Sequence, residues 1–93
     1  MKYPKIKSVK PMENQRLWVV FDEGTEKLYD CTPLLAMKAF EPLQHVWLFN
    51  QVKVDTGGYG ISWNDEIDLA ESELWLNGVE TVNSTQRELT ALA

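Results

Sequence analysis

The chain is poor in the residues that build disulfide frameworks and metal centres. Its 93 residues include one cysteine, Cys31, and one histidine, His45. A lone cysteine makes no internal disulfide, so nothing in the sequence requires an oxidising compartment. Zinc sites use three or four side-chain ligands, more than this pair supplies. We therefore expect no metal and no cofactor and, because the N-terminus has no apolar signal segment, a cytoplasmic location.

Long apolar runs and an excess of basic charge are also absent. No stretch approaches the roughly 18 apolar residues of a membrane-spanning helix, so we expect no membrane contact. Lys and Arg number 9 against 14 Asp and Glu, a net charge of −5. Such a chain repels phosphate backbones, so direct nucleic-acid binding is disfavoured. One basic segment is interpreted as the solvated face of an edge strand, with a minor DNA contact as the alternative; it holds Lys2, Lys5, Lys7 and Lys10.

What remains is the composition of one small globular domain. Hydrophobic residues make up 44% and charged residues 25%, both ordinary for such domains. We expect residues 1–76 to form the domain and residues 77–93 to form a C-terminal tail or short docking helix. Asn77-Gly78 interrupts the chain between them. In the tail, Thr85 and Glu88 have the spacing of a capping box.

Apolar periodicity predicts the first three strands. The clearest is Arg16–Phe21, with apolar residues on both faces, which is typical of a central strand. Glu26–Asp30 returns beside it as a hairpin. Tyr3–Met12 predicts the preceding strand. Its alternation slips between Ile6 and Val9, which indicates a bulge or an edge position.

The middle of the chain predicts a helix followed by two more strands. Thr32 is expected to cap the helix, and Pro42 is expected to end it. The strands are Gln51–Asp55 and Ile61–Trp63, joined by a tight glycine turn, and a helical turn is expected over Glu71–Leu76. The sequence therefore predicts an α+β fold. It has a small, mostly antiparallel sheet in β-β-β-α-β-β order, short helices and a C-terminal tail.

An ordered set of short segments gives the chain a family likeness. The set comprises Tyr3–Pro11, Leu17–Phe21, Gly24, Tyr29-Asp30, Pro33–Leu35, Phe40, Pro42-Leu43, Phe49–Val52, Gly57-Gly58, Ser62-Trp63 and Ile67–Leu69. Together these resemble the bacterial domain of unknown function 2442 family over about residues 3–76. The resemblance implies a three-strand meander, a short helical crossover and two further strands. Family members stand alone or precede a helix-turn-helix domain, and some belong to toxin–antitoxin-like gene pairs. The resemblance implies no catalytic residues.

Four tryptophans are the most distinctive feature of so short a chain. Trp18 lies on the face of its strand opposite Leu17, Val19 and Phe21, so its side must be covered by the domain's helix, its tail or another chain. Tryptophan is enriched at interface hot spots. The candidate interaction or ligand surface comprises Trp18, Trp63, Asp68 and Trp75. Because a small domain buries only about 60% of its unfolded surface, we also expect a homodimer.

These observations favour a binding protein over an enzyme. A catalytic Cys31–His45 pair is formally possible, but Cys31 lies in a segment that is expected to be buried and therefore inert. Our first hypothesis is a non-enzymatic protein–protein interaction module, an antitoxin-like or regulatory partner of another small bacterial protein. The alternative is a small-ligand-binding domain with a pocket near Trp63 and Asp68.

Overall fold

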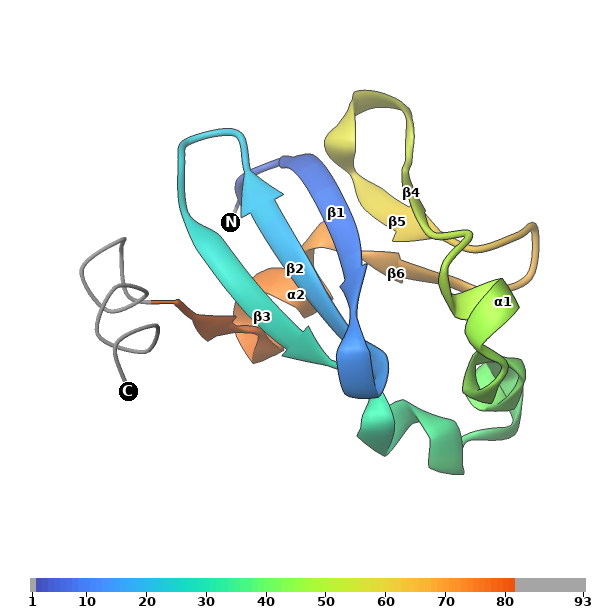
Figure 1. The fold of residues 1–93 in the computed structure, drawn as a ribbon. Helices are drawn as coiled ribbons and strands as arrows, with labels where there is room; N and C mark the ends of the chain where they lie inside the picture. Colours follow the sequence, from blue (N-terminus) through green and yellow to red (C-terminus); the bar gives the residue numbers. More distant parts are fainter. Residues whose placement is uncertain (1, 82–93) are drawn as a thin grey trace, which may run out of the picture.

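A computed structural model describes residues 2–81 and contains two small antiparallel sheets (Figure 1). The first sheet has the order β1-β2-β3-β7, with β1 at Ile6–Met12, β2 at Arg16–Phe21, β3 at Glu26–Asp30 and β7 at Val79–Glu80. The second has the order β4-β5-β6, with β4 at Lys53–Val54, β5 at Gly60–Ser62 and β6 at Asp68–Ala70. The predicted α+β class is confirmed, with the strands divided between two sheets.

The predicted hairpin and its edge neighbour are confirmed in detail. Strand β2 lies between β1 and β3, and its pairing with β3 runs from Arg16 opposite Asp30 to Val20 opposite Glu26. Strand β1 forms the edge of the sheet, and its register shifts between Ile6 and Ser8. The slip in apolar alternation at this point therefore marks a real irregularity in the ladder.

The predicted crossover helix is different in the structure. Two 3-10 helices, η2 (Thr32–Ala36) and η3 (Lys38–Gln44), precede a single α-helical turn, α1 (Val46–Phe49). Pro42 lies inside η3, so the prediction that it ends the helix was wrong. The break comes at Met37, whose extended backbone (ψ 131°) separates η2 from η3. Proline lacks an amide donor but keeps its carbonyl, and the Pro42 carbonyl accepts a hydrogen bond from the His45 amide.

The start of this crossover also differs from the prediction. Thr32 was expected to be the N-cap residue, but the capping position belongs to Cys31, which makes no side-chain cap bond. Asp30 instead accepts a hydrogen bond from the Thr32 amide at 2.9 Å. An aspartate that accepts a hydrogen bond from the backbone amide two residues later is a common turn device.

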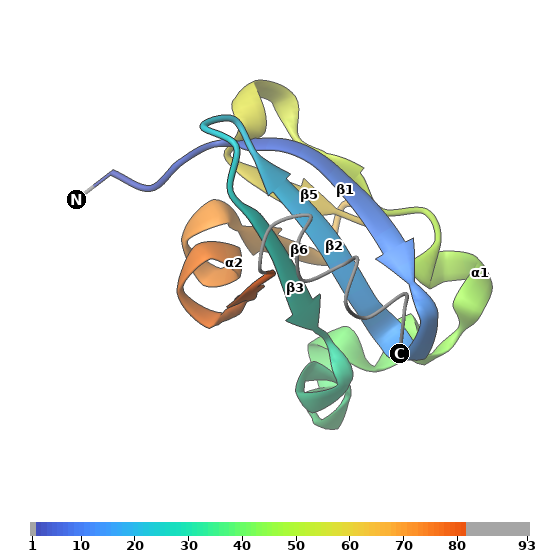
Figure 2. The same cartoon turned by 60° about the vertical axis from the view of Figure 1, so that its left-hand side comes forward.

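The core lies between the two sheets and under helix α2 (Glu71–Asn77). Figure 2 shows α2, β5 and β6 on one side of the β1-β2-β3 sheet. On that inner side Leu17, Val19 and Phe21 have no exposed surface. The ring of Trp75 in α2 meets the ring of Phe21 edge-on, with centroids 5.0 Å apart. Helix α2 therefore closes the core against the first sheet.

The glycine turn of the second sheet packs against the first sheet. The helical turn η4 (Thr56–Gly58) connects β4 to β5, and both of its glycines have positive φ. Gly58 packs so closely on β1 that an added Cβ would lie 2.6 Å from the Ile6 carbonyl oxygen. The tight turn predicted here is confirmed, and its close approach to β1 explains why glycine is required.

The described chain returns to the first sheet after α2. The helical turn predicted over Glu71–Leu76 is confirmed. Residues Val79 and Glu80 then pair with β3 as the short strand β7, opposite Leu28 and Lys27. The capping-box prediction in the tail falls outside the described residues. Among residues 2–81, no helix is long and apolar enough to cross a membrane.

Candidate functional site

The structure does not bring the four candidate surface residues together. Trp63 is a core residue with only 4% of its surface exposed. Its indole N–H donates to the Phe49 carbonyl at 3.0 Å, and the two rings lie 6.2 Å apart. Asp68 is exposed on β6, opposite Ser62. Since the Trp63 ring is buried and its only donor is used, it offers little to a ligand near Asp68.

The Trp75 side chain packs helix α2 against the first sheet. Its half-buried ring packs on Phe21, and the ammonium group of Lys27 lies 4.1 Å from the ring centroid. The same ammonium donates to the Trp75 carbonyl. The Tyr29 hydroxyl adds a hydrogen bond of 2.8 Å to Glu73 on the same helix. Together these contacts hold helix α2 against the inner face of the first sheet, and Trp75 contributes to the packing there.

Trp18 lies on the opposite, outer face of the first sheet. The strand register places it between Lys10 of β1 and Leu28 of β3, and Leu28 in turn faces Val79 of β7. These four residues form one cross-strand line, the outer row: Lys10, Trp18, Leu28 and Val79. The prediction that Trp18 projects away from the Leu17 face is thus confirmed by the alternating burial along β2.

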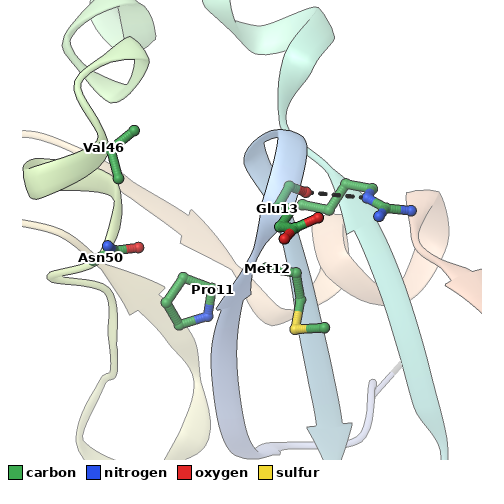
Figure 3. A pocket seen from close by; sticks show the side chains of 6 residues that line it. Pro11, Met12, Glu13, Val46 and Asn50 are labelled. Carbon is green, nitrogen blue, oxygen red and sulfur yellow. Dashed lines mark hydrogen bonds between the residues drawn. The ribbon is translucent and has the colours of Figure 1, made fainter.

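A pocket that the sequence did not predict lies between the β1–β2 turn and helix α1 (Figure 3). Its volume is about 460 Å³, and it is lined by Pro11, Met12, Glu13, Arg16, Val46 and Asn50. Figure 3 shows Val46 and Asn50 on one wall and Pro11, Met12 and Glu13 on the other. We call it the turn pocket. Its lining combines three apolar residues with one acid, one base and one amide.

The wall formed by the β1–β2 turn is held in place by two hydrogen bonds. The 3-10 turn η1 (Glu13–Gln15) has positive φ at Asn14 (61°) and Gln15 (54°), which is uncommon for residues other than glycine. The Gln15 carbonyl accepts from the Cys31 amide at 2.9 Å, and Arg16 Nε donates to the Glu13 carbonyl at 3.2 Å. These bonds maintain a turn in which each of the two residues costs about 1–3 kcal/mol in backbone strain.

The facing wall, helix α1, carries the most exposed tryptophan of the described chain. Leu48 and Phe49 are buried, whereas Val46 and Trp47 are 63% and 68% exposed. The His45 ring lies 6.4 Å from the Trp47 ring at a tilt of 30°. Sequence reasoning selected Trp18 and missed Trp47. The available signal was the run Val46–Phe49, because a single helical turn packed on one side cannot bury four consecutive apolar residues.

The catalytic alternative finds little support in this geometry. Cys31 has no exposed surface, and burial together with the nearby Asp30 charge raises the pKa of its thiol to about 12. A thiol of this kind remains protonated and unreactive at neutral pH. His45 is exposed beside Trp47. Within residues 2–81, no three His, Cys, Asp or Glu side chains are grouped as metal ligands.

The burial of Cys31 and Tyr29 makes the free energy of unfolding fall at alkaline pH. Burial raises the pKa of Cys31 from 9.0 to about 12, and burial plus the bond to Glu73 raises the pKa of Tyr29. Both groups are neutral when folded, so their contribution is complete below pH 9 and is lost as the pH rises toward 12. Urea unfolding should show a loss on the order of 2 kcal/mol between pH 8 and pH 11. The loss should be smaller in Cys31→Ala and in Tyr29→Phe; identical pH slopes in all three proteins would contradict the assignment.

The comparisons with known proteins agree with the family resemblance. Residues 6–80 match the family described as Protein of unknown function (DUF2442). This match spans every strand and helix from β1 to β7. No curated protein and no solved structure matches the chain significantly. The chain therefore belongs to the DUF2442 family.

Proposed function

We propose that this protein is a non-enzymatic protein–protein interaction module whose partner is another small, basic protein. The observation that carries the proposal is the apolar surface at one end of the fold, where exposed Val46 and Trp47 adjoin the turn pocket. The partner inserts an apolar side chain into this pocket and covers Trp47. The biological role that fits such binding is that of a regulatory or antitoxin-like partner.

The composition of this surface supports a protein partner. Tryptophan, methionine and arginine are enriched at interfaces between proteins, and Trp47, Met12 and Arg16 lie at this end of the fold. A domain of this size has few large apolar side chains, and most of them are needed in its core. It nevertheless leaves 68% of Trp47 in water. Burial of that ring by a partner would remove apolar surface from water and so favour binding.

The charge of the chain supports a basic partner. The net charge of −5 attracts a positively charged protein over long range and speeds encounter. The same charge excess disfavours direct contact with nucleic acid. An acidic module that covers a basic surface prevents that surface from reaching RNA or DNA, which is how an antitoxin-like partner acts. Affinity should therefore fall as salt concentration rises.

The experiment compares two exposed aromatic residues. Tagged protein is used to capture partners from nuclease-treated bacterial lysate, and the captured partner is then titrated in purified form. Trp47→Ala should weaken its binding by about 30-fold, as expected for a hot spot worth about 2 kcal/mol. Tyr59→Ala is the matched control, because Tyr59 is 60% exposed on the η4–β5 turn. Its affinity should stay within about twofold of wild type.

Two outcomes would overturn the proposal. One is the absence of any stoichiometric protein partner after nuclease treatment. The other is equal loss of binding in Trp47→Ala and Tyr59→Ala, which would place the interface elsewhere. A metabolite that changes tryptophan fluorescence in wild type but not in Asp68→Asn would instead favour the small-ligand alternative near Asp68.

A further inference from the structure

We propose that the side chain which the partner inserts into the turn pocket is an arginine, whose methylene stem is the apolar part that enters and whose guanidinium group binds Glu13 and Asn50. The inference rests on the proposed function and names the group that the pocket receives from a basic partner. It follows from the apolar lining of the pocket, from the acceptors that the fold leaves available there, and from the charge of the chain.

The apolar part of the lining suits the stem of a long side chain. Pro11, Met12 and Val46 supply the apolar surface, and Met12 and Val46 are 37% and 63% exposed. Figure 3 shows Val46 on one wall and Pro11 and Met12 on the other. An arginine buries its methylene groups on such a surface while its charged end stays in contact with water. The pocket volume of about 460 Å³ leaves room for one such side chain.

Two polar side chains on opposite walls of the pocket have acceptor atoms available. Glu13 of turn η1 and Asn50, the residue after α1, are both exposed. Among residues 2–81, neither the Glu13 carboxylate nor the Asn50 side-chain amide forms a hydrogen bond or an ion pair. A guanidinium group carries five N–H donors in a planar fork, so one arginine can donate to acceptors in more than one direction.

The arginine that already lines the pocket does not occupy these acceptors. Arg16 Nε donates to the main-chain carbonyl of Glu13 at 3.2 Å, which leaves the Glu13 carboxylate available. Arg16 also lies opposite Asp30 in the β2–β3 ladder. Hydrogen bonds from Thr32 and, to a smaller extent, the positive charge of Arg16 lower the pKa of Asp30. The charge of Arg16 is therefore partly balanced by Asp30, and the Glu13 carboxylate remains for a cation from outside.

The charge of the whole chain favours a cationic group over a neutral one. The net charge of −5 attracts cations toward the surface of the protein. Arginine is enriched at interfaces between proteins, whereas lysine is depleted there. A guanidinium group is also less strongly hydrated than an ammonium group, which lowers the cost of entering a partly apolar pocket. Arginine therefore fits the lining, the acceptors and the charge of this protein.

Blocked single amino acids test this preference without the partner. N-acetyl-L-argininamide, its neutral counterpart N-acetyl-L-citrullinamide and N-acetyl-L-leucinamide are titrated separately into the isotope-labelled full-length protein. The arginine probe should shift the resonances of the Asn50 side-chain amide and the Val46 methyl groups. Its affinity should exceed that of the other two probes by about fivefold. The methyl resonances of Leu76, which is exposed on α2, should not move.

A pair of glutamate variants tests the charged contact. Glu13→Gln replaces the carboxylate with a neutral amide and should reduce the preference for arginine over citrulline to less than about twofold. Glu80→Gln is the matched control, since Glu80 is exposed on β7 at the opposite edge of the first sheet, and it should keep the full preference. Equal affinity for the arginine and citrulline probes in the wild type, tighter binding of the leucine probe, or a preference that survives Glu13→Gln would overturn the proposal.

This test and the test of the proposed function fail separately. Capture of a protein partner through Trp47, combined with no probe preference for arginine, would overturn only the arginine proposal. Selectivity for arginine that depends on Glu13, combined with no captured protein partner, would overturn only the interaction module.

Discussion

Replacing Gly58 with alanine is expected to lower the free energy of unfolding by about 3 kcal/mol. Two costs combine at this position. The backbone has a φ of +77°, which L-residues rarely adopt, and the new Cβ would lie 2.6 Å from the Ile6 carbonyl oxygen and 3.0 Å from its nitrogen. Since both atoms belong to the backbone of β1, the strand itself must move. Urea unfolding followed by tryptophan fluorescence measures the change.

Two other glycines separate these costs. Gly24 has a φ of +106° but no atom within 4 Å of the added Cβ, so Gly24→Ala should cost about 1–2 kcal/mol from backbone strain. Gly60 lacks a positive φ but its Cβ would lie 2.6 Å from the Leu69 carbonyl oxygen. Gly60→Ala should therefore cost about 1–3 kcal/mol from the clash. If Gly58→Ala proves no worse than Gly24→Ala, the close approach of η4 to β1 is wrong.

Replacing Phe21 with alanine is expected to cost about 3–5 kcal/mol. Phe21 has no exposed surface and is among the largest fully buried side chains. Its removal leaves a cavity in the inner face and deprives the Trp75 ring of the edge contact at 5.0 Å. The loss approaches the lower end of the stability of a domain of this size, for which about 0.05–0.15 kcal/mol per residue is typical.

A milder variant keeps this prediction measurable if Phe21→Ala does not fold. Phe21→Leu preserves much of the volume and should cost about 1–1.5 kcal/mol. Leu76→Ala is the control on helix α2, because Leu76 is 62% exposed and should change stability by less than about 0.5 kcal/mol. Equal destabilisation by Phe21→Leu and Leu76→Ala would mean that α2 does not close the core through Phe21.

The sheet elements were the most predictable part of the fold. Alternation along Arg16–Phe21 gave the correct inner face, and the slip between Ile6 and Val9 located the irregularity that lies between Ile6 and Ser8. Period-two patterns carry this information because a strand with one buried face permits only one register. The glycine turn was equally clear, since its residues allow few other backbone conformations.

The crossover and the candidate surface were less predictable. A proline-containing apolar stretch such as residues 32–44 is compatible with either α or 3-10 helix, and the pattern does not distinguish the two. The tryptophans share one chemistry but have different positions in space. Trp63 is buried and Trp47 is exposed, although both lie in short segments next to apolar residues.

The α+β class, the hairpin, the tight turn and the family could all be predicted from the sequence, because each depends on neighbours within a few residues or on an ordered set of local features. The tertiary structure alone decided which tryptophan faces water and where a pocket lies. The turn pocket joins residues 11–16 to residues 46–50, which are distant in the chain. Their meeting depends on how the crossover packs on the sheet, and local periodicity carries no information about that contact.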